Sequence, residues 1–193
     1  MRRIIYILAN VILSAIIFAS CSGVDEENTV NGFEYVDLGL PSGTKWAASN
    51  IGAKVPESTG SYFAWGEISE SNYTEAECET CNLSVADLTK HEIIKSLRLT
   101  ADYDAATYNM GIGWQTPTKQ QYEELKSNCT WMWQDKPSGY KIVAKNGKSI
   151  FLPTTGYMSD GRNLNYANQG FYWTSEVESG SSKNAIGLGF SSN

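Results

Sequence analysis

The chain has 193 residues, a formal net charge of −6 at pH 7 and a hydrophobic content of 41%. This length suits one ordinary domain. The acidic balance has no lysine- or arginine-rich run to offset it, which argues against nucleic acid and anionic lipid surfaces as electrostatic partners. With one histidine and four cysteines, the chain also offers few side chains for metal or acid–base chemistry.

The N-terminus predicts a secretory leader. Arg2 and Arg3 precede an apolar run that ends at Cys21, which is the order of parts in a signal peptide. Residues 18–21, Phe-Ala-Ser-Cys, resemble the bacterial lipobox, and this resemblance implies cleavage before Cys21 and acylation of its sulfur and amine. Residues 1–20 are therefore expected to be removed, which makes the mature chain two charges more negative. The alternative is an uncleaved membrane anchor, because the run is about long enough to span a bilayer.

Residues 21–32 form a polar, acidic segment without apolar periodicity, which predicts a flexible tether. Acidic residues just after the lipid-bearing cysteine also resemble the surface-export signal of Bacteroidetes lipoproteins. This resemblance implies a protein that is displayed outside the cell outer membrane. Two or three acyl chains on Cys21 would hold it there far better than one.

The folded domain is expected over residues 33–193, and its first part predicts short strands followed by helices. Alternating or apolar segments, FEYVDLGL, TKWAASNIGA and GSYFAWGEI, occur between residues 33 and 68. A polar loop is expected to follow them. We then expect a helix over 84–97 that is capped by Ser84, and a short helix over 100–110 that is capped by Thr100.

The stretch GIGWQTPTKQQYEEL, residues 111–125, leads from a glycine turn into another helix. Thr118 and Gln121 have the spacing of a capping box, and Tyr122 and Leu125 share one helix face. A glycine turn before a helix can cradle a phosphate. The third glycine of G-x-G-x-x-G is missing, however, and no Gly-Lys-Ser/Thr is present. We therefore expect a turn that aims the helix at the core and binds no ligand.

The second half predicts a β-rich region. Segments that alternate or run apolar between glycine turns are TWMW, GYKIVAKNGKSIFLP, TTGYM, GFYWTSE and AIGLGF. Asn146-Gly147 favours a type I′ hairpin turn. Helices in the first half and strands from both ends of the domain indicate the α+β class.

The cysteines favour a disulfide or free thiols over a metal site. Cys78-x-x-Cys81 can close a small disulfide in an oxidising envelope. It could also be half of a zinc site with His91 and Cys129, but structural zinc sites usually have two pairs at short spacing. Cys129 ends the predicted helix and is expected to be a small buried residue.

Six blocks resemble, in this order, the Fibrobacter succinogenes major paralogous domain, which is common in lipoproteins of gut Bacteroidetes. Residues 114–125 also resemble the R-L-P-T-x-x-E-W-E segment of formylglycine-generating enzymes. Both resemblances imply a C-type-lectin-like fold, with two or three helices against a twisted, mostly antiparallel sheet whose termini pair. Family members run on past AIGLGF to a final strand, so this chain is expected to lack its last C-terminal strand. The six blocks are YVDLGLPSGTKWAASNIGA, GSYFAWGE, DAATYNMGIGWQTPTKQQYEEL, NCTWMW, GKSIFLPTTGY and GFYWTSE.

No catalytic pattern is present, so we expect no enzyme, no cofactor and no metal. His91 is the only histidine, and neither G-x-S-x-G nor H-E-x-x-H occurs. The oxidase activity of formylglycine-generating enzymes depends on a C-terminal cysteine pair, and no cysteine follows Cys129. Acidic pairs such as Glu123 and Glu124 are typical of solvated faces, and a glycosidase pair cannot be inferred from their spacing.

Sugar binding is the alternative function. True C-type lectins coordinate calcium through Glu-Pro-Asn or Gln-Pro-Asp with Trp-Asn-Asp, and none of these tripeptides occurs here. The corresponding region is rich in asparagine and aromatic residues, a composition that suits polar ligands or protein surfaces. Asp160, Asn163, Asn165 and Tyr166 are its candidate ligand-binding residues. The alternative is a loop of ordinary turn residues.

The tryptophans divide into two groups. Trp46, Trp65, Trp114 and Trp173 lie in the family blocks and are expected in the core. Trp131 and Trp133 lie on one side of a predicted strand. They form either an exposed stacking platform for a sugar or partner, or part of the core.

Together these features predict a surface-exposed lipoprotein that acts as a non-enzymatic binding or adhesion module. Its expected contacts are the membrane, through Cys21, and a host or bacterial surface protein or glycan. The alternatives are a carbohydrate-binding, calcium-dependent lectin-like domain and a structural component of a surface assembly.

Overall fold

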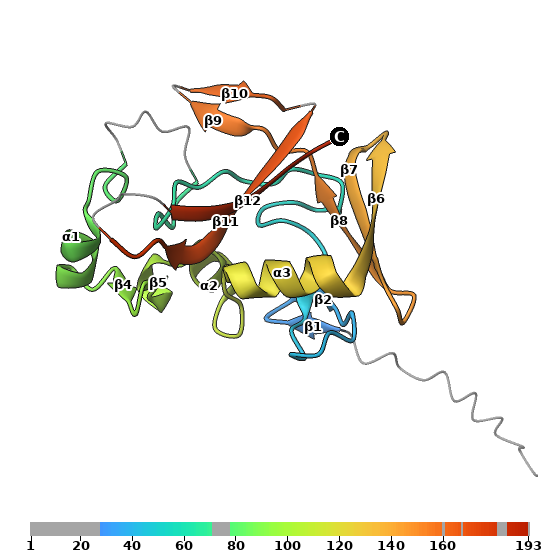
Figure 1. Cartoon of the computed structure of the whole chain (residues 1–193), viewed down its shortest axis with the longest axis horizontal. Coiled ribbons are helices and arrows are strands. Elements are labelled where there is room, and N and C mark those ends of the chain that lie inside the picture. Colours follow the sequence, from blue (N-terminus) through green and yellow to red (C-terminus); the bar gives the residue numbers. More distant parts are fainter. Residues whose placement is uncertain (1–27, 71–77, 160, 167, 181–184, 193) are drawn as a thin grey trace, which may run out of the picture.

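The computed structural model of the chain describes residues 28–70, 78–159, 161–166, 168–180 and 185–192. Cys21 and Asp160, both singled out from the sequence, lie outside these ranges. Within them the protein is a mixed α+β structure with three short α-helices and mostly antiparallel sheets (Figure 1). None of the described helices is long and apolar enough to cross a bilayer.

The described strands form four separate sheets, and α3 (Lys119–Asn128) runs through the middle of the molecule (Figure 1). The N-terminal sheet is distinct from the sheet that holds the last strand, so a single sheet built from both ends is not found in the described residues. Residues 28–32, placed in the tether from the sequence, include the first strand and its turn. In spatial order the sheets are β1 (Thr29–Val30), β2 (Phe33–Val36) and β3 (Trp46–Ala47); β6 (Cys129–Asp135), β7 (Ser138–Ala144) and β8 (Ser149–Pro153); β12 (Ala185–Ser191), β11 (Gln169–Val177), β5 (Arg98–Leu99) and β4 (Ile94–Lys95); and the hairpin of β9 (Tyr157–Ser159) with β10 (Arg162–Leu164).

The larger core lies between α3 and the β6–β7–β8 sheet. Tyr122 and Leu125 of α3 pack with Ile142 of β7 and Leu152 of β8, and Leu125 and Ile142 are 0% exposed. Burial of a large aliphatic side chain stabilises a fold by about 1.5–3 kcal/mol. The apolar helix face predicted from residues 122 and 125 is therefore confirmed. The same cluster includes Leu38, Leu40, Trp46, Ala144 and Ile150.

Cys129 departs from the expectation of a small buried residue. It caps the C-terminal end of α3 and begins β6, and its side chain is only half-buried. The change from helix to strand turns this position out of the helical face on which its spacing placed it.

A second, smaller core forms around α1 (Val85–Lys90) and the β4–β5 hairpin. Trp65, Leu88, Ile94 and Val177 are buried together there, and Ile93 joins them. The Trp65 Nε1 donates a hydrogen bond to the backbone oxygen of Thr174, 2.8 Å away. Because Thr174 lies on β11, this bond joins the second core to the central strand of its sheet.

The helix expected over 84–97 is much shorter than predicted. Ser84 caps α1 in a capping box, as its sequence predicts. The helix then ends at Lys90, and Leu97 takes a φ of 63° in the turn between β4 and β5. Ile93 and Ile94 are therefore buried from a hairpin, because an apolar pair at helical spacing also fits a strand that turns back.

The helix expected over 100–110 is divided in two. Thr100 precedes a short 3-10 turn but makes no side-chain cap hydrogen bond, so its predicted capping role is wrong. The residue that caps α2 (Ala105–Met110) is Asp104, which the sequence analysis did not single out. A cap at Asp104 is physically favoured because a carboxylate both accepts backbone N–H bonds and suits the positive end of the helix dipole.

The Asp104 carboxylate is buried, with 3% exposed, and it joins two segments. It accepts hydrogen bonds from the backbone N–H groups of Ala106 (2.9 Å) and Thr107 (3.1 Å). It also accepts from the backbone N–H (3.0 Å) and the hydroxyl (3.1 Å) of Thr116. Asp104 thereby fixes α2 to the segment that leads into α3, which starts in the Thr118–Gln121 capping box that the sequence predicts.

The β7–β8 turn is not the type I′ turn expected from Asn146-Gly147. Gly147 takes a φ of 81°, but Asn146 is not among the residues with positive φ. The Gly147 N–H donates to the Ala144 oxygen at 3.0 Å. This is a type I turn followed by a left-handed glycine, the common three-residue hairpin connection. The two strands themselves lie where the sequence predicts them.

We predict that Asp104→Ala lowers the free energy of unfolding by about 2–4 kcal/mol, because it removes a helix cap and leaves buried N–H groups unpaired. Chemical denaturation measures the loss. Asp102→Ala is the matched control, since Asp102 is an exposed carboxylate two residues away, and it should change stability by less than about 0.5 kcal/mol. Equal effects of the two variants would contradict the role given to Asp104.

Buried tyrosines predict a loss of stability in alkali. Burial raises the pKa of Tyr122, and also that of Tyr172, above the usual 10.0. Above pH 10 the unfolded chain therefore ionises these groups while the folded chain does not, so the unfolded state binds fewer protons and the free energy of unfolding falls as pH rises. Below pH 10 the two states bind equally and the effect is absent.

Tyr122→Phe should reduce this alkaline slope by up to about 1.4 kcal/mol per pH unit. Denaturant unfolding measured at intervals between about pH 9 and 11.5 gives the slope for both proteins. Parallel curves would show that the Tyr122 phenol ionises equally in the folded and unfolded states.

Candidate functional site

The candidate ligand-binding residues fall into two groups that the structure does not bring together. Asn163 lies on β10, and Asn165 and Tyr166 follow it in the next turn. Trp131 and Trp133 lie on β6, in a different sheet. A single site made of all these residues is therefore not present.

Trp131 and Trp133 form part of an inner aromatic cluster. Both are half-buried, and both rings meet the edge of Tyr140, with centroids 5.5 and 5.2 Å away. Tyr140 in turn meets Phe190 of β12 at 5.4 Å, and Phe190 stacks on Tyr172 of β11 at 5.9 Å. Of the two alternatives left open for these tryptophans, the structure shows packing against the core rather than an exposed platform.

The Asn163 side chain is used to hold its own hairpin in place. Its Nδ2 donates to the Tyr62 hydroxyl at 2.8 Å and to the Thr155 oxygen at 3.2 Å. Gly156 lies directly beneath, with no room for a Cβ against the Leu164 oxygen. The amide therefore secures β9 and β10 to the segment that contains Tyr62. Nearby, the exposed Asn165 has a φ of 58°.

A group of exposed apolar side chains lies on β9, β10 and β11, and we call it the aromatic face. Its members are Tyr157, Leu164, Phe171 and Trp173, which are 40%, 38%, 44% and 46% exposed. Tyr157 pairs with Leu164 across the hairpin, and its ring meets that of Phe171 edge-on at 5.3 Å. Phe171 and Trp173 are two positions apart on one strand, which puts them on the same side of the sheet.

Glycines leave the rings of the aromatic face uncovered. Gly187 and Gly189 of β12 lie opposite Trp173 and Phe171 in the ladder. A Cβ built on Gly189 would lie 3.5 Å from the Phe171 ring, and one on Gly187 would lie 3.5 Å from the Trp173 ring. No side chain from β12 therefore stands beside these two rings.

The exposure of Trp173 corrects its predicted place in the core. Its neighbours Tyr172 and Thr174 point inward, where Tyr172 stacks on Phe190 and Thr174 is 1% exposed. Trp173 faces outward, and its Nε1 donates to the Phe63 oxygen at 3.0 Å, which fixes one edge of the ring. Trp46 and Trp65 are buried as predicted, at 7% and 8% exposed.

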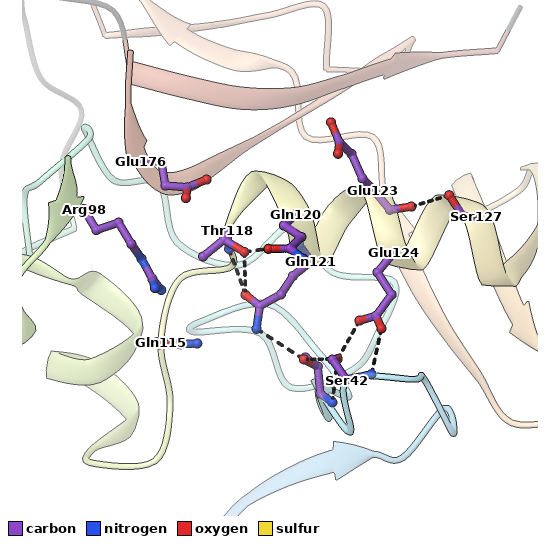
Figure 2. Close-up of a pocket in the computed structure, with 11 residues that line it drawn as sticks. Ser42, Arg98, Gln115, Thr118, Gln120, Gln121, Glu123, Glu124, Ser127 and Glu176 are labelled. Carbon is purple, nitrogen blue, oxygen red and sulfur yellow. Dashed lines mark hydrogen bonds between the residues drawn. The ribbon is translucent and has the colours of Figure 1, made fainter. Parts of the chain in front are cut away.

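A polar groove of about 560 Å³ lies beside the N-terminal end of α3 (Figure 2). Its walls come from the β3-side loop, α3, β5 and β11. It differs from the aromatic face in that charged and amide side chains line it. The lining residues are Ser42, Thr44, Arg98, Gln115, Thr118, Gln120, Gln121, Glu123, Glu124, Ser127 and Glu176.

The carboxylates of this groove are occupied by the protein itself. Glu124 accepts from the Ser42 N–H at 2.8 Å and from its hydroxyl at 2.6 Å. Glu176 accepts from the Lys119 N–H at 2.7 Å. Figure 2 shows Glu124 turned down toward Ser42, with Glu176 on the far side of the groove. The bonds tie α3 to a loop on one side and to β11 on the other, so the groove fastens elements together.

Nucleophilic and metal chemistry find little support in the described residues. Cys78 and Cys81 are joined in a disulfide. Burial, and then the nearby Glu124 carboxylate, raise the pKa of the Cys129 thiol, which lowers its thiolate fraction at neutral pH. Among the residues that the structure describes, no three His, Cys, Asp or Glu side chains gather closely enough to hold a metal ion.

Comparison of the chain with protein-family models, curated proteins and solved structures gave no match. A function for the protein therefore has to be argued from the geometry of its own residues. The aromatic face is the feature that asks for a partner, because contiguous exposed apolar side chains mark interaction surfaces.

We predict that Glu124→Ala lowers the free energy of unfolding by about 1–2 kcal/mol, because both hydrogen bonds to Ser42 are lost. Glu123→Ala is the matched control: Glu123 makes only a 3.9 Å ion pair with Lys119, between side chains that are 64% and 61% exposed, so its loss should cost less than about 0.5 kcal/mol. Thermal or denaturant unfolding of both variants compares them. A larger cost for Glu123→Ala would show that the groove is not fastened as described.

Proposed function

We propose that this protein is a lipid-anchored, surface-exposed module that binds a partner through the aromatic face and catalyses no reaction. The observation that carries the proposal is the row of half-exposed rings on β9 and β11, which lies beside bare glycines on β12. Large rigid rings supply contact area at a low cost in side-chain entropy, which is why aromatic residues are enriched in binding surfaces.

The placement of the aromatic face supports this function. The β9–β10 hairpin lies along the upper edge of the molecule in Figure 1, whereas β1 and β2 lie along the lower edge. A tether that joins the domain at residue 28 from a lipid at Cys21 would leave the hairpin pointing away from the membrane. The α+β architecture is compatible with the proposed C-type-lectin-like scaffold of the paralogous-domain family, in which variable loops form the contact surface.

A glycan is the ligand class that the aromatic face favours over a protein. The C–H face of a sugar ring packs on a flat aromatic ring, and Trp173 and Phe171 are left uncovered by Gly187 and Gly189. The four members of the aromatic face are uncharged, which suits neutral sugar units. We therefore propose calcium-independent stacking, unlike the calcium coordination of true C-type lectins.

The test is a glycan array probed with the intact protein and with the Gly189→Thr variant. A Cβ at Gly189 makes only ordinary contacts with Phe171, the nearest atom being 3.5 Å away, so the fold should persist while the added side chain stands beside the rings. We expect Gly189→Thr and Trp173→Ala each to weaken binding at least about tenfold, since about 1.4 kcal/mol of contact would be lost. Met132→Ala is the control, because Met132 is 43% exposed on β6, outside the aromatic face.

Binding that is lost with EDTA would favour the calcium-dependent alternative. Binding that all three variants retain would show that the aromatic face is not the contact surface. Turnover of a bound glycan by the intact protein would contradict the non-enzymatic role.

A further inference from the structure

The end of the molecule that holds the glycine turn carries the most exposed large apolar side chain in the described residues. Ile112 is 91% exposed, between Gly111 and Gly113, whose φ values are 87° and 108°. We call residues 30–33 and 111–113 together the basal turn. Phe33, at 39% exposed, is its second exposed apolar residue.

The basal turn is held in shape by hydrogen bonds between its two segments. Asn31 Nδ2 donates to the oxygens of Met110 (3.0 Å) and Ile112 (2.8 Å). Trp114 Nε1 donates to the Val30 oxygen at 3.0 Å. A Cβ on Gly111 would lie 2.7 Å from the Asn31 amide, so this approach requires glycine. Ile112 is therefore presented by a braced turn.

The chemistry of the basal turn suits a lipid interface. In a chain with a formal net charge of −6, residues 28–33 and 105–118 contain no charged side chain. An apolar tip without neighbouring charge can enter the boundary between headgroups and acyl chains with no charge to desolvate. The same tip would gain little from a water-soluble acidic or basic partner.

The length of chain before residue 28 brings a bilayer within reach of the basal turn. Seven peptide steps separate Cys21 from Asn28, which span at most about 25 Å when fully extended. The first strand, Thr29–Val30, belongs to the basal turn itself. A lipid at Cys21 would therefore hold Ile112 at a high effective concentration beside the membrane, where a small apolar contact is enough to bind.

We propose that the basal turn docks on the lipid bilayer with Ile112 inserted at its interface, which fixes the orientation of the anchored domain. The proposal rests on the lipid anchor of the proposed function. It goes beyond that function because a tether alone leaves the domain free to tumble. Docking instead turns the aromatic face outward.

The test uses full-length lipidated protein in vesicles of phosphatidylcholine and phosphatidylethanolamine. In a Cys129→Ser background, Ile112→Cys and, as the matched control, Leu164→Cys on β10 carry an environment-sensitive fluorophore. We expect the probe at 112 to shift to the blue and to be quenched by nitroxide lipids at least about fivefold more strongly than the probe at 164, because only the first lies at the interface. Mass spectrometry of the N-terminal peptide reports acylation of Cys21.

A second measurement avoids the labelled side chain. Hydrogen exchange of the peptide around residue 112 in the otherwise native protein should slow on vesicles, and Ile112→Asp should lower the ratio of docked to undocked protein about tenfold, since burial of the isoleucine is lost.

The outcomes separate the proposals. An acylated Cys21 with an unshifted probe at 112 would overturn docking and leave the anchor standing. An unacylated Cys21 would overturn both. A shift that disappears at one protein per vesicle would show a second copy of the chain on the basal turn and overturn the bilayer as its occupant.

Discussion

One buried carboxylate, that of Asp104, holds together the segments on which both proposed surfaces depend. It caps α2, whose C-terminal end leads into the turn that carries Ile112. It also holds Thr116 through the backbone N–H and the hydroxyl. The next residue, Pro117, accepts the Ser175 N–H of β11 at 2.9 Å. A buried carboxylate is costly unless its hydrogen bonds are made, so these segments form as one unit.

From this centre the structure separates its roles in space. The polar groove beside α3 resembles a site in its composition, but its carboxylates are held by Ser42 and Lys119. The exposed apolar groups lie elsewhere, on β9–β11 above and at Ile112 below (Figure 1). An anchored binding module needs this division, with one surface for the membrane and another for a partner.

The sequence predicted well those features that local chemistry decides. The capping boxes at Ser84 and Thr118 each depend on residues three positions apart, and the strands of the second half follow alternation between turns. The helix over 84–97 was wrong because Leu97 turns the chain into a hairpin. Asp104 was missed because its partner Thr116 is twelve residues away, beyond any local pattern.

The site was harder to predict because it depends on which face of a strand meets the core. The position of Trp173 within a family block could not reveal that β12 places Phe190 inward and leaves Gly187 and Gly189 outward. One signal was present in the sequence: AIGLGF alternates large residues with glycine, which indicates a strand with one bare face. The asparagines near residue 165 were less informative, because Asn163 serves its own hairpin.

The central claim is that the anchored domain keeps its aromatic face in solution, free to bind. Hydroxyl-radical footprinting of the lipidated protein on vesicles, read by mass spectrometry, measures this directly. The account predicts that Phe171 and Trp173 are oxidised as fast on vesicles as in detergent, while Ile112 becomes protected. Protection of Phe171 and Trp173 by the vesicle alone would contradict it, because the face proposed for a partner would then be buried against the membrane.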